Sequence, residues 1–160
     1  MTAKADFTPD DWAALGRAPL IAGMAISLAD PGGPIELTKE SMAAMRSVLT
    51  AASGDEPQLV ADVRKDFENE AREHHNPVSG FKPKNPQELL DELTRVSGLV
   101  VAQATPEEAE AFRGLLRTAA RDAADAAKEN GFLGFGGEQV SARETEMLAQ
   151  IDAAIAAPAA

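Results

Sequence analysis

The chain has 160 residues, 44% of them hydrophobic but only 4% aromatic, and its formal net charge is −11 at pH 7. This length suits one domain with its own core, and an excess of Ala, Leu, Val, Ile and Met favours closely packed helices over a sheet. The acidic surface repels phosphate backbones and anionic lipid heads, so no nucleic-acid partner and no membrane partner is expected. Cysteine is absent, which excludes disulfides, thiolate metal sites and cysteine nucleophiles.

The first residues lack the basic start and apolar core of a secretory signal. The longest apolar stretch, residues 18–29, is too short to span a bilayer and indicates a buried helix. These two observations predict a cytoplasmic protein.

The first helix has a clear start. Thr8 precedes Pro9 and two acidic residues, as an N-cap does, and Phe7 and Trp12 have the spacing of a hydrophobic staple. Because proline lacks an amide donor, we expect this helical region to break or kink before Pro19.

The stretch 18–29 then forms the central helix of the predicted fold. Ala22, Gly23 and Ala25 leave little side chain on it, so a neighbouring helix can approach closely. A further helix is expected after Thr38, with Leu37 and Met42 as its hydrophobic staple.

Helical periodicity and three further N-caps predict helices in the rest of the chain. Caps with a glutamate three residues later occur at Asn85, Thr105 and Ser141. The predicted apolar stripes are Met42/Met45/Leu49/Ala52, Val60/Val63/Phe67/His74, Leu89/Leu93/Val96/Val100, Ala109/Phe112/Leu116/Ala119/Ala123 and Leu148/Ile151/Ile155. The sequence therefore predicts an all-α fold: a single-domain bundle of about six helices, residues 1–160, around the Ala/Gly-rich helix 18–29. Residues 76–85, rich in Pro, Gly and Lys, are expected to form a mobile loop, and residues 157–160 a frayed tail.

The segment "NGFLGFGG", which begins at Asn130, combines large apolar side chains with glycines. Gly131 suits the left-handed end of a helix, after which Phe132 or Leu133 packs back on the last turn while Phe135 plugs the core. The alternative is a surface for a protein partner, formed by Phe132, Leu133 and Phe135. A phosphate loop would need a lysine and a preceding strand, and a membrane tip would need basic flanks.

Asp66, Glu70 and His74 are spaced by four and share one helix face, so they could supply metal ligands. The alternative is that His74 ends an apolar face and favours the negative end of the helix dipole. The two histidines of the chain are adjacent, and we expect no tightly bound metal or other cofactor.

Arg113, Arg117 and Arg121 form a row that could bind a carboxylate-bearing partner. Alternatively the row is a solvated face paired locally with acidic side chains, namely Glu110, Asp125 and Glu129. No catalytic residues are evident, since the serines are scattered and neither histidine has a motif partner.

The ending "GFLGFGG…VS..E...L..I" and the beginning "W..L..AP.L.G.A...ADP.G" resemble a family of small, uncharacterised, acidic helical bacterial proteins. That resemblance implies a helical fold and brings no assigned activity. A weaker resemblance is to TerB-like domains of tellurite-resistance systems, in which an acidic turn entering a helix is associated with metal binding. Here Asp30 and Glu36 are present in "ADPGGPIE", whereas Gly136 replaces the acid in "GGEQVSARE".

Three functions follow from these observations. The first is a non-enzymatic helical protein that binds a protein partner or self-associates. The second is a small metal-binding or metal-stress protein. The third is a carrier of an apolar ligand, with its pocket between helices.

Overall fold

The computed structural model describes residues 1–29, 45, 46, 48, 50, 56–73, 75–128 and 141–156. Within them lie a short 3-10 helix, η1 (Lys4–Asp6), and five α-helices: α1 (Pro9–Ala29), α3 (Gln58–Arg72), α4 (Pro86–Gln103), α5 (Pro106–Lys128) and α6 (Ala142–Ala156). These residues contain no strand, so the all-α prediction is confirmed for this part of the chain. The sequence predicted about six helices, and the described residues contain five α-helices; at residues 45, 46, 48 and 50 the backbone is also helical.

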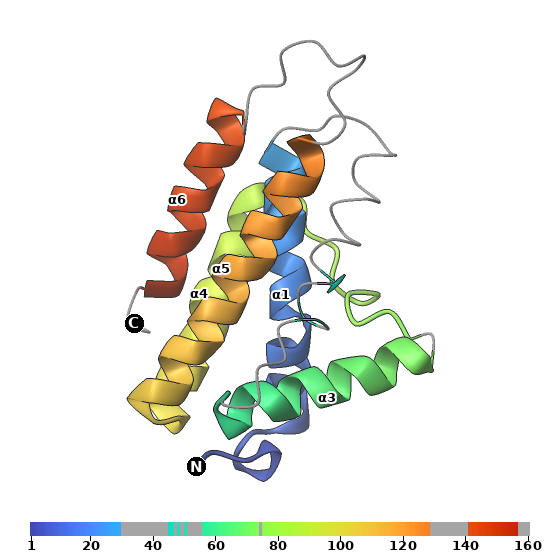
Figure 1. Ribbon diagram of the computed structural model, residues 1–160, viewed down its shortest axis with the longest axis vertical. Helices are drawn as coiled ribbons and strands as arrows, with labels where there is room; N and C mark the ends of the chain where they lie inside the picture. The colour runs from blue at the N-terminus through green and yellow to red at the C-terminus, as the bar shows by residue number, and fades with distance from the viewer. Residues whose placement is uncertain are drawn as a thin grey trace.

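Four of the helices lie side by side with their long axes roughly aligned, and α3 crosses them at one end (Figure 1). Helix α1 contacts each of α3, α4, α5 and α6. Its alanines at positions 14, 18, 22 and 25 are completely buried. Because these side chains are small, the neighbouring helices come close to the α1 backbone, and the large side chains of those helices fill the space around it.

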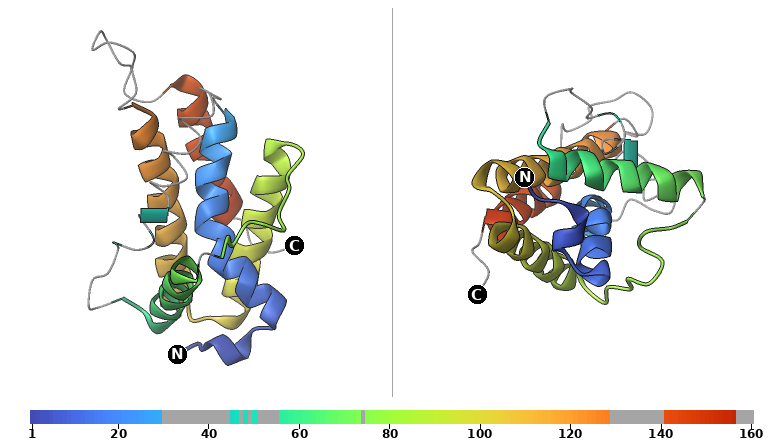
Figure 2. Two further views of the ribbon diagram at one scale, coloured as in Figure 1. Left: turned by 90° about the vertical axis from the view of Figure 1, so that its right-hand side faces the viewer. Right: turned by 90° about the horizontal axis from the view of Figure 1, so that it is seen from below.

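Helix α1 begins at Pro9 rather than at residue 18, and it continues through Pro19. The sequence predicted a break or a kink before this proline; the break is absent, and the helix changes direction along its length (Figure 2). Pro19 removes one helical hydrogen bond, and it is itself buried. Burial of most of α1 between its neighbours offsets that local cost.

Among the described residues, α1 is also long and apolar enough to cross a membrane by length and hydropathy alone. Two thirds of its most apolar window, 67%, is buried inside the fold. The core helix of a protein domain has the same property, so this finding assigns α1 no membrane role.

Four of the predicted N-caps, at Thr8, Asn85, Thr105 and Ser141, are present. The backbone amide of Asp11 donates to the Thr8 hydroxyl at 3.2 Å, and the rings of Phe7 and Trp12 lie 5.7 Å apart. The Asn85 side chain accepts from the amide of Glu88 at 3.1 Å. At Thr105 and Ser141 both halves of the capping box form, each with the glutamate three residues later.

The predicted stripes of α4 and α5 are buried in one continuous core with α1. On α6, Met147 is the buried residue where Leu148 was predicted, and Leu148 is only partly buried. In α3 the apolar stripe was likewise predicted correctly, because Val60, Val63 and Phe67 are each at most 5% exposed.

Several predictions concern residues outside those that the structure describes. These are the Thr38 cap, the glycine segment with Phe132, Leu133 and Phe135, the tail 157–160, and His74 at the end of the α3 stripe. Residues 76–81 contain two turns, closed by hydrogen bonds from Ser79 to Asn76 and from Phe81 to Val78. The mobility predicted for residues 76–85 stays a prediction.

Candidate functional site

A cavity of about 410 Å³ lies where α1, the end of α3 and the segment after α3 meet; we call it the α1–α3 pocket. Most of the side chains around it are apolar. The lining residues are Leu20, Met24, Met45, Ala71, His75, Asn76, Pro77 and Val78. A cavity of this size and character falls within the range of sites that hold small molecules.

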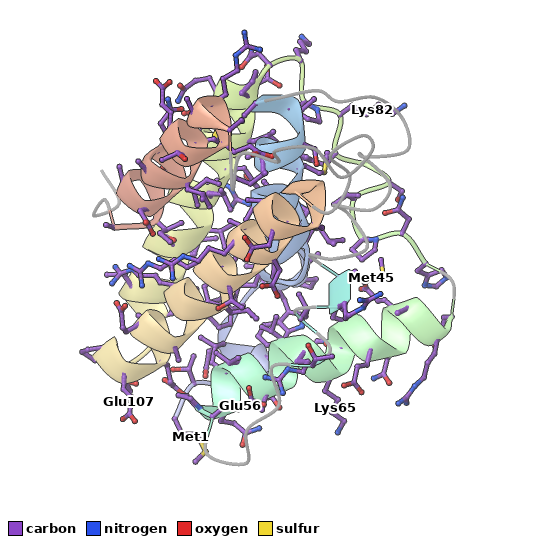
Figure 3. The ribbon with its side chains drawn as sticks, turned by 45° about the horizontal axis from the view of Figure 1, so that its top comes forward. Met1, Met45, Glu56, Lys65, Lys82 and Glu107 are labelled. Atoms are coloured by element: carbon purple, nitrogen blue, oxygen red, sulfur yellow. The ribbon has the colours of Figure 1, made fainter. Side chains whose placement is uncertain are left out.

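Helix α1 supplies the apolar floor of the pocket. Leu20 and Met24 are one turn apart and therefore share a face. Leu20 is buried, whereas Met24, Met45 and Val78 are only partly buried although they pack against the core. Figure 3 shows Met45 on the side of α3 that faces the other helices. The pocket therefore has two methionines in its wall, and methionine is the apolar side chain that adapts most readily to irregular shapes.

The polar part of the pocket comes from the chain that follows α3. The amide of His75 donates to the carbonyl of Glu70 at 2.9 Å, which continues the winding of the helix past its last residue. The Asn76 side chain accepts from the amide of Val78 at 3.1 Å and holds the next turn. These bonds direct Pro77 and Val78 into the pocket wall and leave His75 and Asn76 exposed.

The predicted metal row is only partly described. Asp66 accepts hydrogen bonds from Lys4 Nζ at 2.5 Å and from Trp12 Nε1 at 2.8 Å. Burial alone would raise the pKa of the Asp66 carboxyl, but these two partners outweigh it and lower the pKa. In the described part of the chain no three His, Asp or Glu side chains gather as a metal group would require. His74 lies outside that part, so the row Asp66, Glu70 and His74 stays untested.

The arginine row of α5 is largely engaged within the molecule. Arg117 Nε donates to Asp152 at 3.0 Å, and Arg113 Nε donates to the carbonyl of Ile155 at 2.9 Å. Both also pair with Glu110, as the local-pairing alternative predicted. Arg121 is exposed. The row thus attaches the C-terminal turn of α6 to α5, a contact that the sequence alternatives did not include.

A second polar cluster lies at the opposite end of α1, and we call Thr2, Thr105 and Glu108 the N-terminal anchor. The buried Glu108 carboxylate accepts hydrogen bonds from the amide of Thr2 at 2.9 Å and from its hydroxyl at 2.7 Å. It also accepts hydrogen bonds from the amide and the hydroxyl of Thr105, each at 3.1 Å. Burial would raise its pKa, but these four donors outweigh burial and lower the pKa to about 2. The polar groups of the anchor are hydrogen-bonded to one another, so the anchor has a structural role: it holds the N-terminal residues against α5.

Sequence reasoning did not find the α1–α3 pocket. The spacing of Leu20 and Met24 was visible, but the same spacing describes any buried helix face. His75 and Asn76 were read only as the end of α3 and the start of a loop. The missing information was the position of α3 relative to α1, which no local pattern encodes.

Comparison of the chain with protein-family models, with curated proteins and with solved structures gave no match. Both family resemblances therefore stay predictions.

Proposed function

We propose that this protein binds a small, largely apolar molecule in the α1–α3 pocket, as a carrier or sensor without catalytic activity. The observation that carries the proposal is the cavity of about 410 Å³, whose described lining consists of six apolar residues and of two polar ones at its exposed side. In such a cavity the apolar side chains bury the apolar part of a ligand, and the polar side chains fix its orientation by binding its polar end.

The lining residues favour binding over catalysis. Among the described lining residues His75 is the one titratable side chain, and none of them carries a hydroxyl or carboxylate group. A general acid or base needs a reacting partner within hydrogen-bond reach, and the lining residues offer His75 none that could serve as a nucleophile.

A protein-binding surface has less support in the described residues. Their exposed large apolar side chains are Met1, Leu28 and Val101. Leu28 and Val101 lie on different helices, near the last residue of each. Single exposed apolar side chains are usual on protein surfaces and need no partner.

The proposal can be tested with a neutral fluorescent probe, N-phenylnaphthylamine, whose emission rises on transfer from water to an apolar site. Ala71→Phe places a ring in the pocket wall, and the matched control Ala102→Phe places the same ring on an exposed residue of α4. We expect saturable binding to the wild type, an affinity lower by about tenfold or more in Ala71→Phe, and no change in Ala102→Phe. Absence of saturable binding to the wild type, or equal affinities for the two variants, would contradict the proposal.

A further inference from the structure

The exposed side of the α1–α3 pocket is bordered by groups of negative or partly negative charge. Ala71 belongs to the last turn of α3, where the backbone carbonyls of the helix give a partial negative charge. The Glu73 carboxylate follows directly and lies 3.5 Å from Nδ1 of His75, which lines the pocket. The chain as a whole carries a formal charge of −11, so the field around the molecule also attracts cations.

The positive side chains near the pocket lie outside its lining. Arg72 is three-quarters exposed and pairs with Glu68 one turn back at 3.5 Å. Arg17 is engaged by Glu92 at 2.8 Å on the α4 side of α1. Lys82 extends outward from the segment after α3 (Figure 3), and Arg46, which follows Met45, is exposed. Among the lining residues that the structure describes, there is no lysine or arginine that would neutralise an anionic ligand.

We infer that the ligand is a small amphiphilic cation, an amine whose apolar part fills the α1–α3 pocket and whose ammonium group lies at its exposed side, near Glu73 and the last carbonyls of α3. This inference rests on the proposed function, and it adds the sign of the charge on the ligand. The volume of about 410 Å³, at roughly 30 Å³ for a water-sized group, accommodates on the order of a dozen non-hydrogen atoms. Methionine sulfur is polarisable, which suits a wall that holds an alkyl or aryl chain close to a charge.

Three probes that share an eight-carbon alkyl group and differ in their head group test this inference: octylammonium, octanol and octanoate. Each is titrated calorimetrically into the full chain at pH 8, where carboxylates and alkylammonium ions are charged and ordinary imidazoles are largely neutral. A unit charge about 4 Å away in water attracts one head group and repels the other, which predicts a preference of about 30-fold for octylammonium over octanoate.

Two variants distinguish the effect of the Glu73 charge beside the pocket from the effect of the net charge of the protein. Glu73→Gln removes the carboxylate beside the pocket, and Glu107→Gln removes an exposed carboxylate at the first turn of α5. Both change the net charge equally. We expect Glu73→Gln to reduce the preference for octylammonium several-fold and Glu107→Gln to leave it unchanged.

The outcomes distinguish the inference from the proposal beneath it. Equal affinities for the three probes, tighter binding of octanoate, or equal effects of the two variants would overturn the cationic ligand while leaving a pocket that binds apolar molecules. If none of the probes binds, the proposed function fails and the inference fails with it.

Discussion

The two ends of α1 differ in how their polar groups are used. Near its N-terminus, the N-terminal anchor and the Lys4–Asp66–Trp12 contacts pair polar groups with each other over large sequence separations. Toward its C-terminus, Leu20 and Met24 border a cavity, and the nearby His75 and Asn76 are exposed. The first end consists of interactions that hold the fold together, whereas the second leaves apolar surface and polar groups available to another molecule.

Under the proposed ligand binding, stability and function depend on different ends of α1. A fold of this size has a net stability of only about 5–15 kcal/mol, so a binding cavity, which forgoes packing contacts, must be compensated elsewhere. The dense polar and apolar contacts near the chain start provide that compensation. Substitutions in the anchor should therefore affect stability, and substitutions around the pocket should affect binding.

The largest expected effect is that of Glu108→Ala. The change removes the acceptor of four hydrogen bonds and leaves the buried amide of Thr2 and the part-buried amide of Thr105 without it. We expect unfolding in urea to show a loss of roughly 2–4 kcal/mol. The adjacent exposed Glu107→Ala should change stability by less than about 0.5 kcal/mol. Similar losses in the two variants would show that the anchor is not a special tie.

The pH dependence of stability follows from the same carboxylate. The pKa of Glu108 in the folded chain is about 2, below its ordinary value of 4.5. Its contribution is therefore fully present above pH 4.5 and is lost as the pH falls toward 2. Across this window the wild type should lose more stability than Glu108→Gln, measured by urea unfolding at each pH. Parallel curves for the two proteins would contradict the assigned pKa.

The contact between α3 and the N-terminal residues should contribute less to stability than the N-terminal anchor does. Trp12→Phe removes the Nε1 donor to Asp66 and keeps most of the ring that packs on Phe7. We expect a loss of about 1 kcal/mol. In a double-mutant cycle, Asp66→Asn and Trp12→Phe should be non-additive, because the two side chains share one hydrogen bond. Strict additivity would mean that this contact does not contribute to stability.

The smallest effect is expected at the pocket. The His75 side chain is 70% exposed, so His75→Ala should change the unfolding free energy by less than about 0.5 kcal/mol. Affinity for the neutral probe should fall nevertheless, since His75 lines the cavity. A large loss of stability in this variant would remove the distinction between the two ends of α1.

Local features of the fold were predictable from the sequence because their partners are close in the chain. The capping boxes at Thr105 and Ser141 each join residues three apart, and the stripes of α4 and α5 follow from helical periodicity. The same reasoning could not show that Glu108 also holds Thr2, which is 106 residues away. Of the break or kink expected before Pro19, the break is absent, because the local cost of a proline was weighed without the burial that surrounds α1.

The candidate site illustrates the same limit. Arg113 and Arg117 were recognised as a row, and local pairing with Glu110 was foreseen, but their contacts with α6 depend on how the helices pack. The α1–α3 pocket brings together side chains from four separate stretches of the chain. Its existence depends on the crossing of α3 over α1, so it became visible only in three dimensions.

The most direct test of the central claim uses the methyl groups of the five methionines. Met24 and Met45 line the α1–α3 pocket, Met147 is buried in the core, and Met1 is 94% exposed. In carbon-13 methyl NMR spectra assigned by substitution, titration with octylammonium should shift the Met24 and Met45 resonances along one saturable curve, while those of Met1 and Met147 stay in place. Saturation without any shift at Met24 and Met45, or equal shifts at Met1 and Met147, would show that the ligand does not enter this pocket.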